Sequence, residues 1–286
     1  MRALVVGGGT MGAGIAQALA QGGLEVILVD VDAGALDRAR TSIHSSLDRL
    51  AVRRRLKEPM TAILGRIATA EDRGDPLPFQ EPPALAIESV PENEDLKRAV
   101  LARIEEAVPT DALIASNTSS IPITDLAAAL THPGRFVGLH FFNPVVMMTA
   151  VEVIAGERSA PDAVEQAVSL VGRLRKDPVV VRRDVPGFVL NRILMAASNE
   201  AMRLVGDGVV SAEDVDRGVK GAFGWKMGPL ETADLVGLDV VLAAREQIHR
   251  RTGDLRFEPP SLLRELVEAG HLGRKTGRGF FAHGEE

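Results

Sequence analysis

The chain has 286 residues, a length that suits two domains better than one. Its net charge of −6 provides no broad basic field for nucleic acid, and its 45% hydrophobic and 25% charged residues are typical of a soluble globular protein. The absence of Cys excludes disulfides, thiolate metal ligands and a Cys nucleophile, and the absence of Tyr excludes the Tyr-Lys pair of short-chain dehydrogenases.

Targeting and metal-binding signals are also missing from the sequence. No apolar run approaches the roughly 20 residues that a membrane span requires, and the first residues lack the apolar segment and cleavage site of a signal peptide. We therefore expect a cytoplasmic protein with no membrane partner. The six His are scattered without the spacing of metal ligands, so we expect no bound metal.

Strand and helix patterns alternate along the first part of the chain. Residues 2–6 form a short apolar run that predicts a buried strand, 11–21 predict a helix, and 25–29 predict a second strand. Further strands are expected at 66–69, 84–88, 112–115, 135–140 and 149–154, and further helices at 33–57 and 94–107. This alternation predicts an α/β domain, with a doubly wound parallel sheet covered on both faces.

The pattern changes near Asp184, where almost all strand signal ends. Helices are expected at 187–205, 211–219, 229–236 and 238–252, followed by a helix and a Gly-rich tail over 259–281. We therefore expect a first domain over residues 1–183 and an all-helical second domain over 184–286.

Residues 7–12 (GGGTMG) fit the pattern G-x-G-x-x-G between the first strand and the first helix. Gly7 permits a tight turn, Gly9 lets the backbone approach a pyrophosphate, and Gly12 lets the helix pack closely on the strand. The start of the helix, at Thr10 and Met11, offers N–H groups to the phosphates. A purely structural Gly-rich turn is the alternative, but the strand–helix context favours a Rossmann-like dinucleotide site.

Asp30 ends the second predicted strand, 18 residues after Gly12. A carboxylate at this point accepts hydrogen bonds from the adenosine ribose and repels a 2′-phosphate. No Arg follows it directly, because the next residues are Val31 and Asp32. The pattern therefore favours NAD over NADP as the cofactor.

The segment 134–153 contains a candidate acid–base pair. His140 ends one predicted strand and Glu152 lies twelve residues later in the next, so a strand–turn–strand can bring them side by side. A carboxylate on one imidazole nitrogen fixes the tautomer and leaves the other nitrogen to exchange a proton with a substrate hydroxyl. On spacing alone, a buried structural His and an unrelated surface Glu remain the alternative.

Eight segments together resemble the 3-hydroxyacyl-CoA dehydrogenase family, in particular its single-function 3-hydroxybutyryl-CoA type, over nearly the whole chain. They are VVGGGTMGAGIAQ (5–17), ESVPENEDLK (88–97), SNTSSIPIT (116–124), GLHFFNP (138–144), VEVI (151–154), DVPGFVLNRIL (184–194), GPLETADLVGLD (228–239) and GRKTGRGFF (273–281). The resemblance implies NAD-dependent interconversion of short-chain (S)-3-hydroxyacyl-CoA and 3-oxoacyl-CoA, by a homodimer.

The resemblance also implies roles for single residues. His140 would be the catalytic base and Glu152 its orienting carboxylate. Ser119 would hydrogen-bond the substrate 3-oxygen, and Asn191 would help to hold the acyl group near His140. From the residues alone, Ser119 is explained as an N-cap of the helix that starts after Pro122, and Asn191 as a polar residue on a helix surface.

Three further residues are implied to lie by the cofactor. Glu92 and Lys97 would flank it, and Asn117 would lie near its nicotinamide end. From the residues alone, Glu92 is also explained as an acidic residue in the first turn of a helix, where the helix dipole favours it.

A basic cluster, Arg53, Arg54, Arg55 and Lys57, ends the long helix expected at 33–57. In the family this region faces the coenzyme A nucleotide, whose phosphates Arg can hold bidentately. The alternative is a solvated helix end, where cations are favoured by the dipole. The chain also departs from the family between His140 and Glu152, because Val146 and Thr149 stand where Pro and Lys are usual, so contacts near the thioester are expected to differ.

These expectations place the active site in a cleft between the two domains, with Ser119 and His140 from the first and Asn191 from the second. Two rivals stay open. One is an NAD-dependent dehydrogenase of a small hydroxy acid or sugar acid without coenzyme A. The other is a non-catalytic NAD-binding protein, against which the intact candidate residues argue.

Overall fold

The computed structural model describes residues 1–74, 77, 79 and 81–284. Residues 285 and 286, the end of the second expected domain, lie outside this description. The chain divides into two compact units, Met1–Val185 and Pro186–Glu286, so the division falls two residues beyond the boundary expected from the sequence. Each unit is described by itself below.

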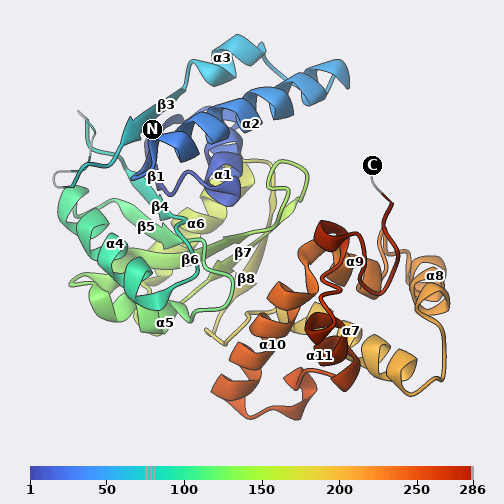
Figure 1. The fold of residues 1–286 in the computed structure, drawn as a ribbon. Coiled ribbons are helices and arrows are strands. Elements are labelled where there is room, and N and C mark those ends of the chain that lie inside the picture. Colours follow the sequence, from blue (N-terminus) through green and yellow to red (C-terminus); the bar gives the residue numbers. More distant parts are fainter. Residues whose placement is uncertain (75–76, 78, 80, 285–286) are drawn as a thin grey trace. The chain divides into compact units, whose positions relative to one another are not determined.

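The first unit is built on one eight-stranded sheet in the order β3-β2-β1-β4-β5-β6-β7-β8 (Figure 1). Neighbouring strands are parallel except β6 and β7, which are antiparallel. The strands are β1 (Arg2–Val6), β2 (Glu25–Asp30), β3 (Ile67–Glu71), β4 (Leu85–Glu88), β5 (Leu113–Ser116), β6 (Phe136–Phe141), β7 (Ala150–Ile154) and β8 (Asp177–Val181). The predicted α/β class is therefore confirmed.

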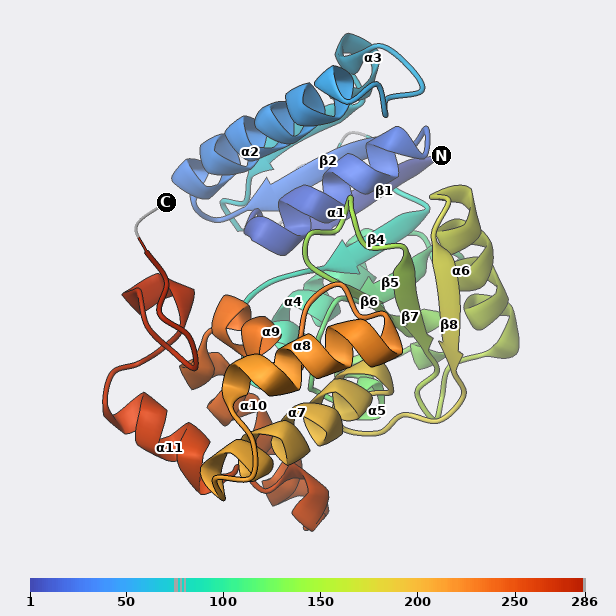
Figure 2. The same cartoon turned by 90° about the vertical axis from the view of Figure 1, so that its right-hand side faces the viewer.

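Helices cover both faces of this sheet (Figures 1 and 2). One face is covered by α1 (Thr10–Gln21), α2 (Ala33–Val52), α3 (Met60–Leu64) and α6 (Pro161–Arg173), and the other by α4 (Glu94–Ala107) and α5 (Ile123–Leu126). Local side chains define where two of these helices begin. Asp32 accepts a hydrogen bond from Gly34 N at 2.8 Å at the start of α2, and Asn93 accepts one from Leu96 N at 2.9 Å at the start of α4.

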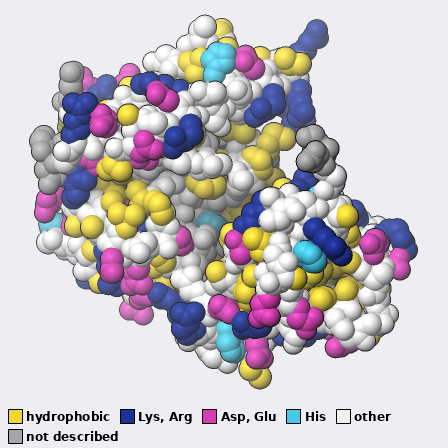
Figure 3. Space-filling model, viewed as in Figure 1, with side chains coloured by type: hydrophobic (Ala, Val, Ile, Leu, Met, Phe, Trp, Pro, Cys, Tyr) yellow, Lys and Arg dark blue, Asp and Glu magenta, His cyan; other side chains and the backbone are white. Residues whose placement is uncertain are grey.

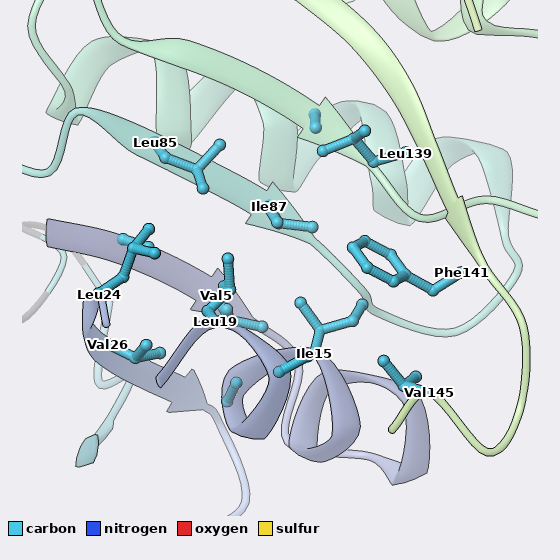
Figure 4. Close-up of a cluster of buried hydrophobic side chains, with 14 of the residues drawn as sticks. Val5, Ile15, Leu19, Leu24, Val26, Leu85, Ile87, Leu139, Phe141 and Val145 are labelled. Carbon is cyan, nitrogen blue, oxygen red and sulfur yellow. The ribbon is translucent and has the colours of Figure 1, made fainter. Parts of the chain in front are cut away.

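The core under α1 anchors the Gly-rich turn (Figure 4). Ile15 and Leu19 of α1 are fully buried against Val5 and Ile87 of the sheet, in a cluster that reaches Phe141. Full burial of such a side chain contributes about 1.5–3 kcal/mol each. This packing fixes the first turn of α1 at the end of β1, where the Gly-rich turn lies.

The helix expected over 33–57 is shorter than predicted and ends at Val52 as α2. Arg54 adopts the left-handed conformation at φ 54°. Arg54 N donates to Ala51 O and Arg55 N donates to Leu50 O, both at 2.9 Å, which is the paired bonding of a Schellman ending. The basic cluster therefore leaves the helix rather than extending it.

The second unit is helical, as predicted. It comprises α7 (Leu190–Gly206), α8 (Ala212–Phe223), α9 (Pro229–Val236), α10 (Leu238–Thr252) and α11 (Ser261–Glu268). Its core includes Met202, Leu230, Leu238 and Leu263, all fully buried. In the described part of the chain, no helix is both long enough and apolar enough to cross a membrane.

Candidate active site

Four strands of the first unit end side by side. The register pairs Val6 with Glu88, Glu88 with Ser116, and Ser116 with Gly138, so β1, β4, β5 and β6 finish along one edge of the sheet. Ligands of doubly wound sheets bind at this edge, beyond the carboxyl ends of the strands. The loops that leave it contain the Gly-rich turn, Glu92, residues 117–120 and the end of β6.

Two glycines of the Gly-rich turn are required by backbone contacts. Gly7 has φ +111°, and a Cβ there would lie 2.4 Å from Ser89 O. A Cβ at Gly12 would lie 1.8 Å from Gly7 O. Gly9 differs, since a Cβ there would meet no described atom within 4 Å. The turn therefore leaves open space over Gly9, where the motif requires a pyrophosphate to approach.

The residues around this space suit NAD. Thr10 and Met11 begin the 12-residue helix α1, whose first-turn N–H groups attract phosphate. Asp30 ends β2, and its two carboxylate oxygens accept hydrogen bonds from Gly8 N at 2.6 Å and Asp32 N at 2.9 Å. A carboxylate has about four acceptor positions, so both ribose hydroxyls can still be accommodated. A 2′-phosphate would meet a like charge.

The antiparallel pairing of β6 and β7 places His140 directly opposite Glu152. His140 Nδ1 lies 2.7 Å from Glu152 Oε2, and the side chains are 7% and 0% exposed. Because an ionised carboxylate only accepts, Nδ1 is the donor and carries a proton. Nε2 is then the ring nitrogen suited to exchange a proton with a substrate.

Asn117 ties two of the strand ends together. It follows β5, and its Oδ1 accepts a hydrogen bond from Phe141 N at 3.0 Å, one residue beyond His140. The Phe142 ring packs against the imidazole at 4.4 Å between centroids. The Asn117 hydrogen bond fixes the backbone just after His140, a role of Asn117 that the sequence did not predict, and the Phe142 ring restricts the imidazole.

Glu92 organises the turn that contains Ser119. Its Oε1 accepts hydrogen bonds from Thr118 Oγ1 at 2.7 Å, from Ser119 N and Ser120 N at 2.9 Å each, and from Ser120 Oγ at 2.9 Å. Burial raises the pKa of Glu92, but the charge of Lys97 and these hydrogen bonds outweigh burial, so the pKa lies below its usual range. The carboxylate is therefore ionised at neutral pH.

Lys97 is buried, with its side chain 1% exposed. Its Nζ donates to Glu88 Oε1 at 2.8 Å and to Val90 O at 3.1 Å, and lies 3.3 Å from Glu92 Oε2. Glu88 is fully buried and also accepts from Ser116 Oγ at 2.6 Å. Sequence reasoning assigned no role to Glu88, although it is an acidic residue that ends the apolar strand LAIE and begins the family-like segment 88–97.

The basic cluster is divided between two adjoining pockets of the first unit. Arg53 lines a pocket of about 280 Å³ beside α1 and α2, and Arg55 and Lys57 line a second pocket of about 430 Å³. Arg54 is exposed and lines neither of these two pockets. Asn191 belongs to the second unit, where it lies half-buried in the first turn of α7.

One buried polar group faces the first pocket. Gln17 is 2% exposed and lines this pocket, and its Nε2 has no hydrogen-bond acceptor among the described residues. A buried donor of this kind suits a ligand carbonyl. The described residues contain no group of three or more acidic or His side chains arranged to hold a metal.

Two family models together match almost the whole chain. The model described as the 3-hydroxyacyl-CoA dehydrogenase NAD binding domain matches residues 2–185, and the one described as the C-terminal domain of the same enzyme matches residues 187–283.

Individual relatives agree with these matches. The chain is 40% identical over 278 residues to 3-hydroxybutyryl-CoA dehydrogenase of Bradyrhizobium diazoefficiens, covering 97% of this chain and 93% of the relative. The solved structure of (S)-3-hydroxybutyryl-CoA dehydrogenase from Ralstonia eutropha is similar with a TM-score of 0.92 and 41% identity, over 99% of both chains. A 5-formyl-3-hydroxy-2-methylpyridine 4-carboxylate 5-dehydrogenase of Mesorhizobium japonicum is 37% identical over 288 residues, 99% of this chain and 90% of the relative.

Proposed function

This chain belongs to the 3-hydroxyacyl-CoA dehydrogenase family, and we propose that its substrate pair is (S)-3-hydroxybutyryl-CoA and acetoacetyl-CoA. It is an NAD-dependent oxidoreductase that interconverts (S)-3-hydroxyacyl-CoA and 3-oxoacyl-CoA. The observation that carries the proposal is the His140–Glu152 pair at the same sheet edge as the Gly-rich turn. The short acyl chain is supported by the names of the two 3-hydroxybutyryl-CoA relatives.

Each candidate residue has a role in this reaction. In oxidation, His140 Nε2 takes the proton of the substrate 3-hydroxyl, and Glu152 stabilises the imidazolium that forms. Bound NAD supplies the acceptor for the hydride that leaves C3. Ser119 Oγ donates a hydrogen bond to the 3-oxygen, and Asn191 holds the acyl group. In reduction, His140 returns the proton to the 3-oxygen.

The two adjoining pockets lie along α1, and we call them together the α1 groove. This groove supports a coenzyme A thioester as the substrate. The two pockets share Val146 and Met147, and α1 lines them from Thr10 in its first turn to Gln21 in its last, about 16 Å of helix. Five cationic side chains line the second pocket, namely Arg55, Lys57, Arg173, Arg175 and Lys176. We propose that the pantetheine arm contacts Gln17 and that the nucleotide phosphates bind at the cationic end.

The rival without coenzyme A is concrete, because the Mesorhizobium relative has a name that includes no coenzyme A. The first experiment is therefore NADH oxidation with acetoacetyl-CoA and with free acetoacetate. We expect kcat/KM for the thioester to be higher by at least about 100-fold, because only the thioester fills the groove. Equal values would support the rival, and no turnover of either would support a non-catalytic protein.

The groove can be tested by its own residues. Arg53→Ala, and Arg55→Ala with Lys57→Ala, should each raise KM for acetoacetyl-CoA by about tenfold, the loss expected for one charge-assisted contact, and leave KM for NADH unchanged. Arg54→Ala is the matched neighbour and should have the smallest effect. If all three changes raised KM for acetoacetyl-CoA equally, the cluster would act through its general positive charge and not through specific contacts.

We also propose a homodimer formed through the second unit. Large apolar side chains are exposed there around the α9–α10 junction, at Leu235, Val236 and Val240, and on α8 at Phe223, which is 72% exposed. Exposed apolar surface of this kind marks protein interfaces. Light scattering should give twice the chain mass, and Val240→Asp should reduce it to one chain mass.

We place the enzyme in the cytoplasm, where NAD and coenzyme A thioesters are both available to it. Cell fractionation should recover the protein with cytoplasmic markers.

A further inference from the structure

The turn that contains Ser119 depends on side chains for its conformation. Residues 117–120 follow β5, and the Glu92 carboxylate accepts the backbone N–H groups of Ser119 and Ser120. The Ser119 hydroxyl also lies 3.3 Å from Glu92 Oε1. The position of this hydroxyl is therefore set by the position and charge of Glu92.

Glu92 is held in turn by a buried cation. Lys97, on α4, lies with its Nζ between Glu88 Oε1 and Glu92 Oε2. Glu88 is fixed from three sides, since it accepts from Lys97 at 2.8 Å, from Val90 N at 2.6 Å and from Ser116 Oγ at 2.6 Å. A chain of contacts thus runs from the end of β4 through α4 to the Ser119 turn.

A contribution to stability alone does not account for the buried charges of Glu88, Lys97 and Glu92. Replacing a buried ion pair by packed apolar residues of similar volume is often neutral or stabilising. A charge network is advantageous where one geometry must be selected over near alternatives, as in a site that holds a substrate oxygen.

We propose that Glu88 and Lys97 are positioning residues that act through Glu92 to hold the Ser119 hydroxyl against the substrate 3-oxygen. The inference rests on the role proposed above for Ser119. It assigns Lys97 to the Ser119 turn rather than to the cofactor, and it adds Glu88, which neither the sequence patterns nor the resemblance singled out.

The charge of Glu92 gives the proposal a pH signature. An ionised Glu92 accepts hydrogen bonds from the turn, whereas a protonated Glu92 must donate one of its own and lose acceptor capacity. Lys97 counteracts the effect of burial and lowers the pKa of Glu92. Without Lys97, burial is opposed only by hydrogen bonds, so Glu92 should take up a proton at a higher pH than in the wild type.

The test uses the full chain in acetoacetyl-CoA reduction, with Lys97→Met and Glu88→Gln as separate variants. We expect each to lower kcat by about 10–100-fold, the range for a misplaced substrate-holding group, with the dissociation constant of NADH unchanged. In Lys97→Met the acid limb of kcat should move to higher pH. Lys97→Arg keeps the charge and should restore the wild-type limb.

Glu105→Gln is the matched control. Glu105 lies on the same helix and accepts hydrogen bonds from Thr131 N at 2.7 Å and His132 N at 2.8 Å, so it also holds a turn, but away from the strand ends. We expect Glu105→Gln to lower Tm to a similar extent as the other variants and to leave kcat and its pH profile unchanged.

A double-variant cycle separates this inference from the proposed function. If Ser119→Ala lowers kcat and Lys97→Met lowers it no further in combination, the two residues act as one unit. Independent, multiplying losses would overturn the inference and leave the role of Ser119 intact. Full activity of Ser119→Ala would overturn both, and weakened NADH binding in Lys97→Met would assign the Lys to the cofactor instead. If Lys97→Met does not fold, the same double-variant cycle is carried out with Glu88→Gln and Ser119→Ala.

Discussion

Each unit has a described His that pairs with a fully buried carboxylate, and the distances in these two pairs are nearly equal. His140 Nδ1 lies 2.7 Å from Glu152 Oε2, and His283 Nε2 lies 2.8 Å from Asp234 Oδ2. Glu152 and Asp234 are both fully buried. On the distance and the burial of the carboxylate alone, the two pairs are equally good candidates for an acid–base pair.

Their surroundings separate them. Asp234 also accepts hydrogen bonds from Phe280 N at 2.9 Å and Phe281 N at 3.0 Å, and a Cβ at Gly279 would lie 2.1 Å from its Oδ1. Asp234 therefore fastens the C-terminal tail. His140 instead lies near the end of β6, at the same edge of the sheet as the Gly-rich turn. The comparison shows that a His–carboxylate pair by itself does not indicate a catalytic His, and that the groups around the pair must be considered.

The largest effect is expected for His140→Gln. General acid–base catalysis contributes about 10²–10⁴-fold, so kcat should fall by that factor while NADH binding is kept. Steady-state kinetics and NADH fluorescence titration provide the two measurements. If kcat of the folded variant fell by less than about threefold, His140 would not be the base, and the functional distinction between the two pairs would be lost.

Glu152→Gln should lower kcat by a somewhat smaller factor, because the variant keeps the shape of the carboxylate and removes the charge that supports the imidazolium. The double variant with His140→Gln should be little worse than His140→Gln alone, since both residues act as one unit. Losses that multiply in the double variant would mean that Glu152 acts independently of His140.

Asp234→Asn should affect stability rather than catalysis. An amide keeps one acceptor oxygen and replaces the other with a donor, so at least one buried N–H loses its partner, at a cost of about 1–3 kcal/mol. Thermal melting should show Tm lower by several degrees, with kcat per folded molecule unchanged. A fall in kcat as large as that of Glu152→Gln would contradict the distinction between the two pairs.

The smallest expected effect is a change of stability with pH caused by Lys176, which supports the loop between His140 and Glu152. Its Nζ donates to Val145 O at 2.5 Å and Met148 O at 2.6 Å, and burial lowers its pKa, opposed by Asp177. Between the lowered value and the ordinary 10.5, the unfolded chain binds more protons than the folded one, so this group adds stability as pH rises.

The measurement is Tm against pH in this alkaline window, for the wild type and Lys176→Met. The wild type should gain on the order of one degree relative to the variant as pH approaches 10.5. Parallel curves would mean that the Lys176 ammonium has the same pKa in both states.

Local patterns were enough to indicate part of the candidate site. The Gly-rich turn, Asp30 and the His140–Glu152 spacing each depend on a single strand end or hairpin, and such features are written in consecutive residues. The fold class followed from the alternation of strand and helix patterns. The resemblance then supplied the assignment of Ser119 and Asn191, which no local pattern contains.

Other features depend on partners far along the chain. Glu88 meets Lys97 and Ser116 only because β4, α4 and β5 come together, and nothing near Glu88 in sequence indicates a buried cation. The segment 161–181 was not predicted, because β8 is a half-exposed edge strand with little alternation and α6 opens with Pro rather than a capping side chain. The end of α2 required a left-handed Arg54, a conformation that favours Gly.

The reversal of β7 also has a consequence for assembly. His140 and Glu152 meet by closing a chain segment of twelve residues, whereas Glu92 and Ser119 are separated by 27 and Thr124 and Asp184 by 60. The entropic cost of closure rises with segment length, and local pairs form before distant ones. The hairpin that contains the proposed proton-transferring pair therefore closes over the shortest of these three segments, so it can form before the more distant contacts are complete.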